Sequence, residues 1–392
     1  MPTLSLDLMT FSLAHPAGAL TLLLALFWGG LAYTFARAAR RALRQPDTPD
    51  PGLPRPAVSV VIAARNEADT IGGLLRSLLA VDWPRDRLEI IVADDRSTDA
   101  TAAEIDAVAA ESGGIVRRLA IDRVPAGWTP KKWALQTAVD SAGGEIVLTT
   151  DADCRVGPEW IERLTAPLRR ADGPELCGGP VDYAGAVAWR WPKRLLRVEF
   201  FSLSVTAAGS LAAGLPLVIS AQNMAFTRDL FRRCGGYEPH AAIPSGDDVF
   251  LLFAADAAGI GTGYVLEPGA VVTTRAPASW AEFYHQRTRW ASKGLRYPRR
   301  PRLVSALVWL VNASLLLSVA AAALGCGALW PWAAAGLVLK GLGEIALLRL
   351  TKRFGLKHLG IDYLTGVPLH LIYVTLFGAV GALGLFRWKE ST

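Results

Sequence analysis

The stretch Glu145-Ile-Val-Leu-Thr-Thr-Asp-Ala-Asp-Cys154 decides the fold of this chain. Its apolar run, residues 146–148, is typical of a buried strand, and two carboxylates, Asp151 and Asp153, follow at once. In open α/β sheets, ligands bind at the carboxyl ends of the strands, which is where this Asp-x-Asp falls. Two carboxylates on a turn suit a Mg²⁺ or Mn²⁺ ion that also takes oxygens from a diphosphate. The alternative is that these are two acidic residues in an ordinary polar turn. Other motifs in the chain are needed to distinguish a metal site from such a turn.

Length and composition indicate a protein that lies partly in lipid. The chain has 392 residues, and 52% of them are hydrophobic, which allows a large core and membrane segments. The four cysteines have neither paired nor CxxC spacing, which argues against a disulfide framework or a zinc site and suits a reducing compartment. The net charge of +6 is modest and its basic residues cluster beside apolar segments, so we expect no nucleic-acid partner.

Four apolar segments are long enough to cross a bilayer, at residues 17–36, 303–324, 332–348 and 364–386. Arginines at positions 37–44 follow the first segment, so the positive-inside rule places the N-terminus outside and the next residues in the cytoplasm. A cleaved signal peptide is the alternative, but a basic n-region is missing. Four spans also put the C-terminus outside, which the basic Arg387-Trp388-Lys389 fits poorly.

The region between the membrane segments has the pattern of a soluble α/β domain. Apolar strands are expected at residues 58–64 and 88–93, and a third at 115–121, with helical stretches between them. We therefore expect an anchor with a basic flank at 1–44, a linker at 45–56, an α/β domain at 57–277, an interfacial segment at 278–302 and membrane helices at 303–392.

The order of the polar motifs in this chain resembles that of family 2 glycosyltransferases, whose catalytic domain has the nucleotide-sugar-binding GT-A fold. The motifs are residues 58–67, Asp94-Asp95-x-Ser97-Thr98-Asp99, Lys131-x-x-Ala134-Leu135, Asp151-x-Asp153, Asn223-Met-Ala-Phe-Thr-Arg228 with Gly235-Gly236-Tyr237, Ser245-Gly246-Asp247-Asp248, and Gln286-Arg-Thr-Arg289-Trp290. The last one matches the Gln-x-x-Arg-Trp motif of the family's membrane-bound synthases. The similarity covers about residues 57–293, and the shared order of so many motifs argues against chance agreement.

The resemblance implies a role for each motif. Asp151 and Asp153 would bind the metal ion, with Asp153 the more direct ligand, and Asp248 would be the catalytic base beside Asp247. Adjacent carboxylates raise each other's pKa, which would suit a base that acts near neutral pH. A helix N-cap is the alternative role of Asp248. The residues expected to bind the nucleotide sugar are Ala64, Asn66, Glu67, Asp94, Asp95, Lys131, Asp151, Gln286, Arg289 and Trp290.

Some of these roles have an alternative. Asp94 and Asp95 resemble the pair that reads the nucleobase and ribose, although Asp95 could instead hold the loop. Lys131 would neutralise the diphosphate or be a solvated lysine at a helix start, and the family often has glycine where Pro130 stands. The Gln-x-x-Arg-Trp segment would close over the donor, or anchor the chain at the membrane surface, or both.

The residues expected on the acceptor side are Trp189, Trp191, Asn223 and Met224. Residues 189–203 mix basic and aromatic side chains, which is typical of a helix in the headgroup plane of a membrane. An ordinary amphipathic surface helix is the alternative. Lys340 and Glu344 stand four residues apart in the third apolar segment and are expected to pair, because a lone charge in lipid is costly.

We therefore expect a membrane-anchored inverting glycosyltransferase of α/β GT-A fold in the inner membrane, with its catalytic domain in the cytoplasm. It would use a nucleotide-diphosphate sugar, with a UDP-sugar as first choice, and Mg²⁺ or Mn²⁺, and its acceptor would be a lipid or a lipid-linked glycan. A processive polysaccharide synthase is the nearest alternative, but polymer-secreting relatives carry more spans. A transporter or scaffold with an inactive domain is an alternative from another class, and the complete set of motif carboxylates argues against it.

Overall fold

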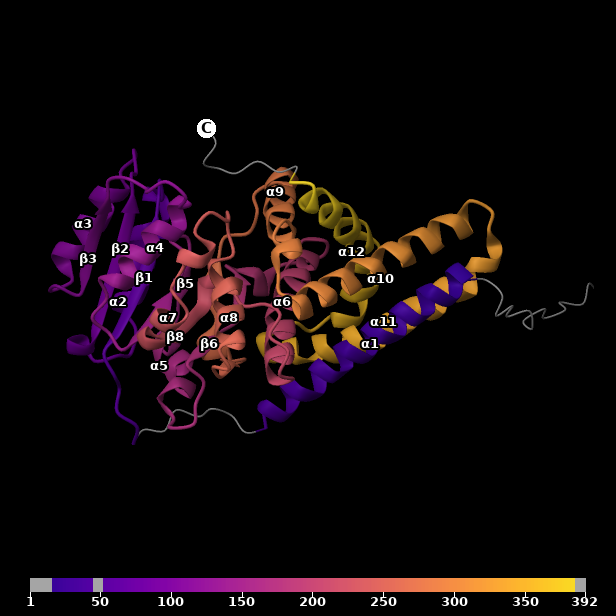
Figure 1. The fold of residues 1–392 in the computed structure, drawn as a ribbon, viewed down its shortest axis with the longest axis horizontal. Coiled ribbons are helices and arrows are strands. Elements are labelled where there is room, and N and C mark those ends of the chain that lie inside the picture. Colours follow the sequence, from indigo (N-terminus) through magenta and orange to yellow (C-terminus); the bar gives the residue numbers. More distant parts are fainter. Residues whose placement is uncertain (1–15, 45–51, 385–392) are drawn as a thin grey trace, which may run out of the picture.

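The computed structural model describes residues 16–44 and 52–384. Most of the expected linker, the last residues of the fourth apolar segment and the basic Arg387-Trp388-Lys389 lie outside the described residues. The α/β domain occupies one end of an elongated molecule, and long helices occupy the other (Figure 1). Catalytic-domain and membrane patterns in the sequence thus correspond to two spatially separate parts of the structure.

A seven-stranded sheet forms the centre of the α/β domain. Its strands lie in the order β3 (Val116–Ile121), β2 (Leu88–Asp95), β1 (Val58–Ala64), β4 (Ile146–Thr149), β8 (Met224–Thr227), β6 (Leu176–Gly178) and β9 (Thr262–Tyr264). The strands β1 to β4 are parallel, and β8 runs antiparallel to both of its neighbours. The chain moves outward from β1 to β3 and returns on the other side of β1 at β4. This reversal of strand order is the place where open α/β sheets bind ligands.

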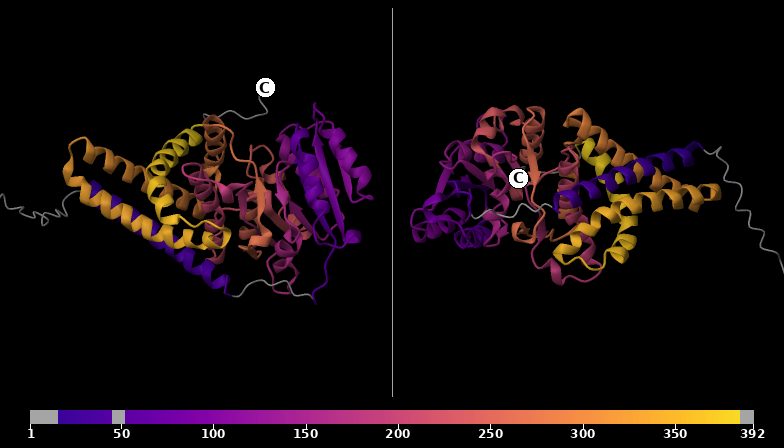
Figure 2. Two further views of the ribbon diagram at one scale, coloured as in Figure 1. Left: turned by 180° about the vertical axis from the view of Figure 1, so that it is seen from behind. Right: turned by 90° about the horizontal axis from the view of Figure 1, so that it is seen from below.

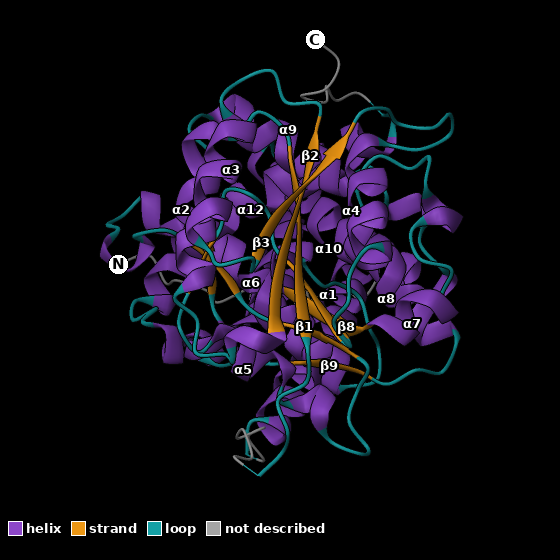
Figure 3. Ribbon diagram, turned by 90° about the vertical axis from the view of Figure 1, so that its left-hand side faces the viewer, coloured by secondary structure: helices purple, strands orange, loops and turns teal. Residues whose placement is uncertain are grey.

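Helices cover both faces of this sheet (Figure 3). One face carries α2 (Ala68–Leu79), α3 (Thr101–Glu111) and α5 (Trp160–Thr165), and the other carries α4 (Pro130–Asp140), α7 (Arg228–Arg233) and α8 (Asp247–Ala257). Alternate residues of β1 enter the two apolar cores, with Val60 and Ile62 in one and Val61 in the other. A strand buried on both faces needs a largely apolar run, which residues 58–64 supply apart from Ser59, whose hydroxyl donates to Glu89.

A second, three-stranded sheet has the order β5 (Arg155–Val156), β10 (Val272–Thr274) and β7 (Val181–Tyr183). The strand β5 follows directly on the Asp-x-Asp turn, and β10 pairs with it in antiparallel fashion. The small sheet therefore lies beside the turn that carries the two carboxylates.

Three helices run along the long axis of the molecule: α1 (Pro16–Ala42), α10 (Arg299–Ala323) and α11 (Trp330–Leu348) (Figures 1 and 2). The backbones of α1 and α11 meet closely, because a Cβ atom on Gly29 would lie 2.3 Å from the carbonyl oxygen of Leu339. Small residues at such contacts are common between membrane helices. Lys340 donates to Glu344 at 2.6 Å, so the expected pairing of these two charges is confirmed.

Three further helices lie between this bundle and the α/β domain. The helices α6 (Lys193–Ala212) and α9 (Trp280–Ala291) run across the near ends of the long helices (Figure 1). Both ends of α12 (Leu359–Ala382) meet them: Arg194 of α6 donates to Asp362 at 2.8 Å, and a Cβ atom on Gly381 would lie 2.7 Å from the carbonyl oxygen of Thr288 in α9. The helix α12 therefore crosses the bundle instead of running along it.

Within the described residues, four helices are long and apolar enough to cross a membrane: α1, α6, α10 and α12. The expected segments at 17–36, 303–324 and 364–386 fall on α1, α10 and α12. The expected segment at 332–348 falls on α11, which is not one of the four, and α6 takes its place. We expected residues 189–203, which include the first half of α6, to lie in the headgroup plane of the membrane. In the structure more than half of α6 is buried, because it packs against both the α/β domain and the bundle.

Candidate active site

The loops that follow β1 and β2 are tied together at the carboxyl edge of the main sheet. Ala64 ends β1 and is paired in register with Asp94 of β2. The side-chain oxygen of Asn66 accepts the N–H of Thr98 at 2.8 Å, and Glu67 is the N-cap residue of the helix α2. The residues expected to bind the nucleotide from these two loops therefore lie side by side.

The two aspartates at the end of β2 are both buried but have different partners. Asp94 lies 3.5 Å from the guanidinium of Arg118 on the neighbouring strand. Asp95 accepts from Arg96 at 2.8 Å and lies 3.9 Å from Arg65, which follows β1. Asp95 thus makes the loop contacts that one of the two sequence interpretations expects.

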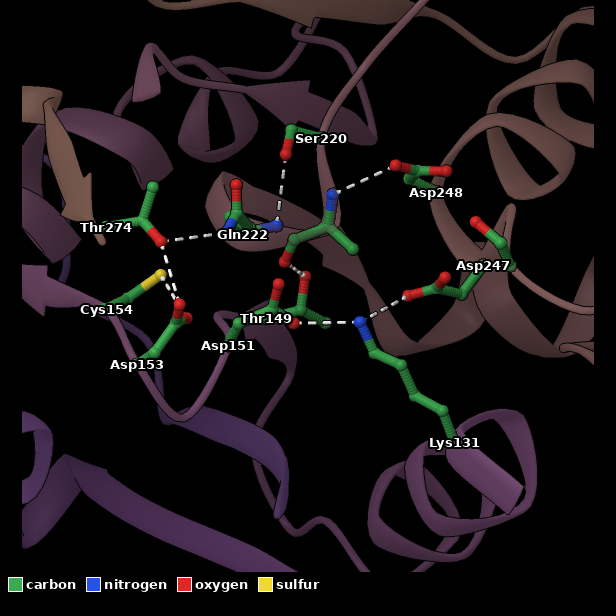
Figure 4. A network of polar contacts seen from close by, with 12 residues as sticks. Lys131, Thr149, Asp151, Asp153, Cys154, Ser220, Gln222, Asp247, Asp248 and Thr274 are labelled. Atoms are coloured by element: carbon green, nitrogen blue, oxygen red, sulfur yellow. Dashed lines mark hydrogen bonds and ion pairs between the residues drawn. The ribbon is translucent and has the colours of Figure 1, made fainter. Parts of the chain in front are cut away.

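Lys131 joins two carboxylates that come from distant segments (Figure 4). Its ammonium donates to Asp151 at 2.8 Å and lies 3.4 Å from the nearer carboxylate oxygen of Asp247. Burial by itself would lower the pKa of Lys131, but the attraction of Asp151 and Asp247 outweighs it and raises the pKa. Lys131 is therefore a charged, ion-paired residue and not a freely solvated one.

Asp153 is oriented toward the small sheet (Figure 4). The hydroxyl of Thr274 on β10 donates to Asp153 at 3.1 Å, and the amide of Gln222 donates to that hydroxyl at 3.3 Å. Burial and the nearby negative charge of Asp151 raise the pKa of Asp153. Two carboxylates that repel each other in a partly buried turn favour a cation between them.

Asp151 and Asp153 are the residues that would hold a divalent cation. Among the residues that the structure describes, no cluster of three or more His, Cys, Asp or Glu side chains forms a metal site. A Mg²⁺ ion bound by one or two carboxylates commonly takes its other ligands from water and substrate phosphates, and these two residues fit that pattern. The all-oxygen donors and the carboxylate repulsion suit Mg²⁺ or Mn²⁺.

Asp247 and Asp248 begin α8, directly after Gly246, whose φ is +82°. A Cβ atom on Gly246 would lie 2.7 Å from the ring of Phe250, so this turn requires glycine. Asp247 is buried, whereas Asp248 is partly exposed and lies 3.7 Å from the ammonium of Lys293. The N-cap position belongs to Gly246, and Asp248 follows in the first turn, where its carboxylate accepts the N–H of Val249 at 2.7 Å.

The expectation that the adjacent carboxylates raise each other's pKa is wrong for Asp247. Burial by itself would raise its pKa, but the ammonium groups of Lys131 and Lys293 outweigh burial and lower it. The sequence shows that two carboxylates are adjacent, but it does not show the lysines that the fold brings to them. Asp247 is therefore a carboxylate that stays charged, and its position suits orientation of Lys131.

The Gln-x-x-Arg-Trp segment lies in α9 and reaches the site through Arg289. The guanidinium of Arg289 donates to the hydroxyl of Ser245 at 3.2 Å, on the turn that leads into α8. Gln286 accepts from Arg287 at 2.8 Å, and Trp290 stacks on Phe200 of α6 with ring centroids 6.2 Å apart. One part of this motif thus contacts the turn that leads into α8, and the other part faces the helix α6.

Two residues expected on the acceptor side belong to the core instead. The side-chain amide of Asn223 donates to two backbone carbonyl groups, and its oxygen accepts from the indole of Trp160 at 2.9 Å. Met224 is fully buried in β8. The polar atoms of Asn223 are all used inside the fold, so the assignment of these two residues to acceptor contact is wrong.

The two expected acceptor tryptophans lie just before α6, not within it, because the helix begins only at Lys193. Trp189 stacks on Tyr183 of β7, with ring centroids 5.6 Å apart. Trp191 is exposed over 59% of its surface. Of the four residues expected on this side, these two remain available at the surface.

Sequence reasoning missed four polar residues near the site: Gln222, Thr274, Arg287 and Lys293. Lys293 had a usable signal, because it follows Arg289 by four residues, about one helical turn. Gln222 and Thr274 had none, because the pairing of β10 with β5 brings Thr274 to Asp153 and Gln222 reaches Thr274 from the separate segment before β8.

Comparisons with known proteins are consistent with this geometry. Residues 54–293, more than half of the chain, match the family model described as glycosyltransferase like family 2. The beta-monoglucosyldiacylglycerol synthase of Synechocystis sp. is 34% identical over 113 residues, which cover 29% of this chain and 23% of that protein. The undecaprenyl-phosphate 4-deoxy-4-formamido-L-arabinose transferase of Pseudomonas paraeruginosa is 34% identical over 143 residues, which cover 36% of this chain and 40% of that protein. This chain thus spans less than half the length of either relative.

A solved structure shares the fold of almost the whole chain. The mannosyltransferase PcManGT of Pyrobaculum calidifontis, in complex with GDP-Man and Mn²⁺, is 23% identical, and the match covers 96% of this chain and 100% of that chain with a TM-score of 0.57. The α/β part is therefore a GT-A-like glycosyltransferase domain. From its family match and its fold, the chain belongs to the glycosyltransferase like family 2.

Proposed function

We propose that this protein transfers a sugar from a nucleotide-diphosphate sugar to a lipid acceptor at the membrane surface. The observation that supports this most strongly is the position of Lys131, which joins the Asp-x-Asp turn to the start of α8. Lys131 thus holds Asp151, a candidate metal carboxylate, against Asp247, the neighbour of the candidate base Asp248, at the reversal point of the sheet.

The roles follow from burial and charge. Asp248 is the partly exposed carboxylate of its pair, so it takes the proton of the acceptor hydroxyl as that oxygen attacks the anomeric carbon. Lys131 and Arg289 present positive charge to the leaving diphosphate. A divalent cation held by Asp151 and Asp153 would neutralise diphosphate oxygens. Attack opposite the leaving group inverts the configuration of the sugar.

The comparisons support the donor and acceptor classes. The archaeal mannosyltransferase was crystallised with a nucleotide sugar and Mn²⁺, and the names of the two curated relatives specify a diacylglycerol lipid and a lipid phosphate. We propose a UDP-sugar donor, with Asp94 and Asp95 beside the nucleoside and Ala64, Asn66 and Glu67 lining the same loops. Because the PcManGT structure contains GDP-Man, the identity of the donor's nucleobase is the first point to test.

We also propose that the protein is integral to the inner membrane and that its catalytic domain, residues 57–277, faces the cytoplasm. The helices α1, α10 and α11 would cross the bilayer; α11 is not one of the four sufficiently apolar helices, but its backbone packs closely along α1. The helix α12 would lie across the inner part of the bilayer, since both of its ends meet α6 or α9. In this arrangement the chain leaves α12 on the cytoplasmic side, contrary to our expectation, and the basic Arg387-Trp388-Lys389 agrees with it. Three crossing helices also favour a lipid acceptor over a secreted polymer.

Calorimetry with purified protein in detergent tests the donor site. We expect UDP to bind in the presence of Mn²⁺, to bind more weakly after chelation with EDTA, and to bind Asp153→Ala more weakly than wild type. The same titrations with GDP and ADP identify the nucleobase that the site prefers. Binding of nucleoside diphosphates that is unchanged by EDTA and by Asp153→Ala would contradict the proposed metal site.

A further inference from the structure

A cavity of about 770 Å³ lies where α6, α9, α11 and α12 meet. Its lining is largely apolar and includes Leu195, Leu203, Phe283, Val367 and Phe377. Some of the apolar lining residues remain exposed, with 73% of Trp280 and 52% of Leu369 accessible. An apolar hollow with exposed apolar side chains, set among helices of membrane length, has the properties of a site for a lipid.

One polar end of this cavity is connected to the catalytic site. Glu199 lines the cavity and accepts hydrogen bonds from Tyr373 at 2.8 Å and from Arg287 at 3.0 Å. Arg287 also lies 3.4 Å from the hydroxyl of Tyr183 on β7. Tyr183 is paired in register with Thr274, which donates to Asp153. Arg287 and one pair of strand residues, Tyr183 and Thr274, therefore link this end of the cavity to Asp153.

The charges that line the cavity compensate one another. The three carboxylates of its lining each have a cationic partner: Glu199 pairs with Arg287, Glu344 with Lys340, and Asp362 with Arg194. The other lysine of the lining, Lys193, is exposed and lies 4.3 Å from the ring of Trp189. A phosphate headgroup would have to enter beside carboxylates and displace one from its partner, which is costly in a site of low dielectric constant.

Hydroxyl groups, by contrast, find suitable partners there. Ser202, Ser279 and His370 line the cavity together with the carboxylate of Glu199, which has further acceptor capacity. A hydroxyl can donate to such a carboxylate without disturbing its ion pair. The lining therefore favours an uncharged headgroup over an anionic one.

We propose that this cavity binds the acceptor and that the acceptor is an uncharged membrane lipid with a free hydroxyl, of the diacylglycerol class. The name acceptor rests on the proposed function, but binding of the lipid in the cavity can be measured without a sugar donor and without turnover. The acyl chains occupy the apolar part between α6 and α12, and the headgroup is held at the Glu199 end before its hydroxyl passes to Asp248 for transfer.

The test uses the full-length protein in phosphatidylcholine vesicles and two photoreactive lipid probes, a diacylglycerol and a polyprenyl phosphate. Gly366→Leu on α12 fills the cavity, because a Cβ atom there would lie 3.8 Å from Leu195 of α6. Gly360→Leu on the same helix is the matched control, because a Cβ atom there would meet nothing within 4 Å. Glu199→Gln tests the charge argument by removing the carboxylate that compensates Arg287.

We expect the diacylglycerol probe to label peptides of α6 and α12 in wild type and in Gly360→Leu. An overfilled pocket should reduce this labelling by about tenfold or more in Gly366→Leu. Glu199→Gln should shift labelling toward the phosphate probe, because it leaves Arg287 uncompensated. Equal or stronger labelling of wild type by the phosphate probe would overturn the proposal, as would unchanged labelling of Gly366→Leu.

Lipid labelling and sugar transfer, measured on the same protein preparation, distinguish failure of the cavity assignment from failure of the proposed function. Diacylglycerol labelling without any sugar transfer leaves the cavity assignment standing and removes the transferase proposal. Sugar transfer that persists while only the phosphate probe labels α6 and α12 removes the cavity assignment alone.

Discussion

Lys131 donates a hydrogen bond to Asp151 at 2.8 Å, although the two residues belong to different elements and lie 20 positions apart. The same ammonium faces Asp247, so it links the Asp-x-Asp turn to the start of α8. Replacement by methionine keeps the length of the side chain and removes the charge. We expect Lys131→Met to lower kcat/KM for the donor by about 10²-fold, the usual scale for one charge-stabilising group.

Lys352→Met is the matched control, since Lys352 is exposed on the loop after α11. Thermal melting in detergent checks that Lys131→Met is folded, because that change leaves the buried Asp247 without its lysine partner. Activity within a few-fold of wild type in folded Lys131→Met would show that the bridge has no catalytic role.

The base assignment predicts a separation between binding and turnover. Asp248→Asn keeps the shape of the side chain but cannot accept a proton, so kcat should fall by about 10²-fold or more. Donor affinity measured by calorimetry should stay near the wild-type value. Asp256→Asn, an exposed position on the same helix, serves as the control. Loss of donor affinity together with activity would move Asp248 from catalysis to donor binding.

The stability of the folded protein should depend on pH through Lys132. This lysine is buried, and its ammonium donates to the carbonyl oxygen of His240 at 2.6 Å. Burial lowers its pKa to about 8 in the folded protein, against an ordinary value of 10.5. Between these values the unfolded chain binds more protons than the folded one, so the free energy of unfolding should rise with pH through this window.

The difference in melting temperature between wild type and Lys132→Met isolates this effect from other alkaline titrations. We expect the difference to shift in favour of wild type as the pH rises from about 8 to about 10. A difference that stays constant over this range would show that Lys132 has an ordinary pKa.

The position of α12 predicts the side of the membrane on which the described chain ends. A reporter fused after Gly384 should be cytoplasmic, together with single cysteines placed at Ser97 and Lys352. In intact cells these cysteines should resist an impermeant thiol reagent, and after lysis they should react. Labelling of Ser97→Cys from outside would reverse the assignment of the catalytic domain, and an external reporter would show that α12 crosses the bilayer.

The sequence was informative wherever a local pattern determined the outcome. The largely apolar run at 58–64 and the carboxylates after residues 146–149 predicted the two central strands and the polar edge where they end. The i, i+4 spacing of Lys340 and Glu344 predicted their ion pair. Each of these features depends on neighbours within one element or at its end.

The sequence was uninformative where distant segments set the environment. The lowered pKa of Asp247 depends on lysines from α4 and from the residues after α9. The burial of Asn223 depends on backbone groups of two other segments and on Trp160. The path of α12 depends on Arg194 and on the close contact of Gly381 with α9, which hydropathy does not show.

Formation of a glycolipid by the purified protein tests the central claim most directly. Full-length protein in vesicles that contain diacylglycerol is incubated with Mn²⁺ and radiolabelled UDP-sugars or GDP-mannose, and the products are extracted into organic solvent. We predict one or a few sugars on a lipid, about 10²-fold or more slowly in Asp248→Asn, and no product in EDTA. Long water-soluble glycan, or the absence of any labelled lipid with every donor, would contradict the account.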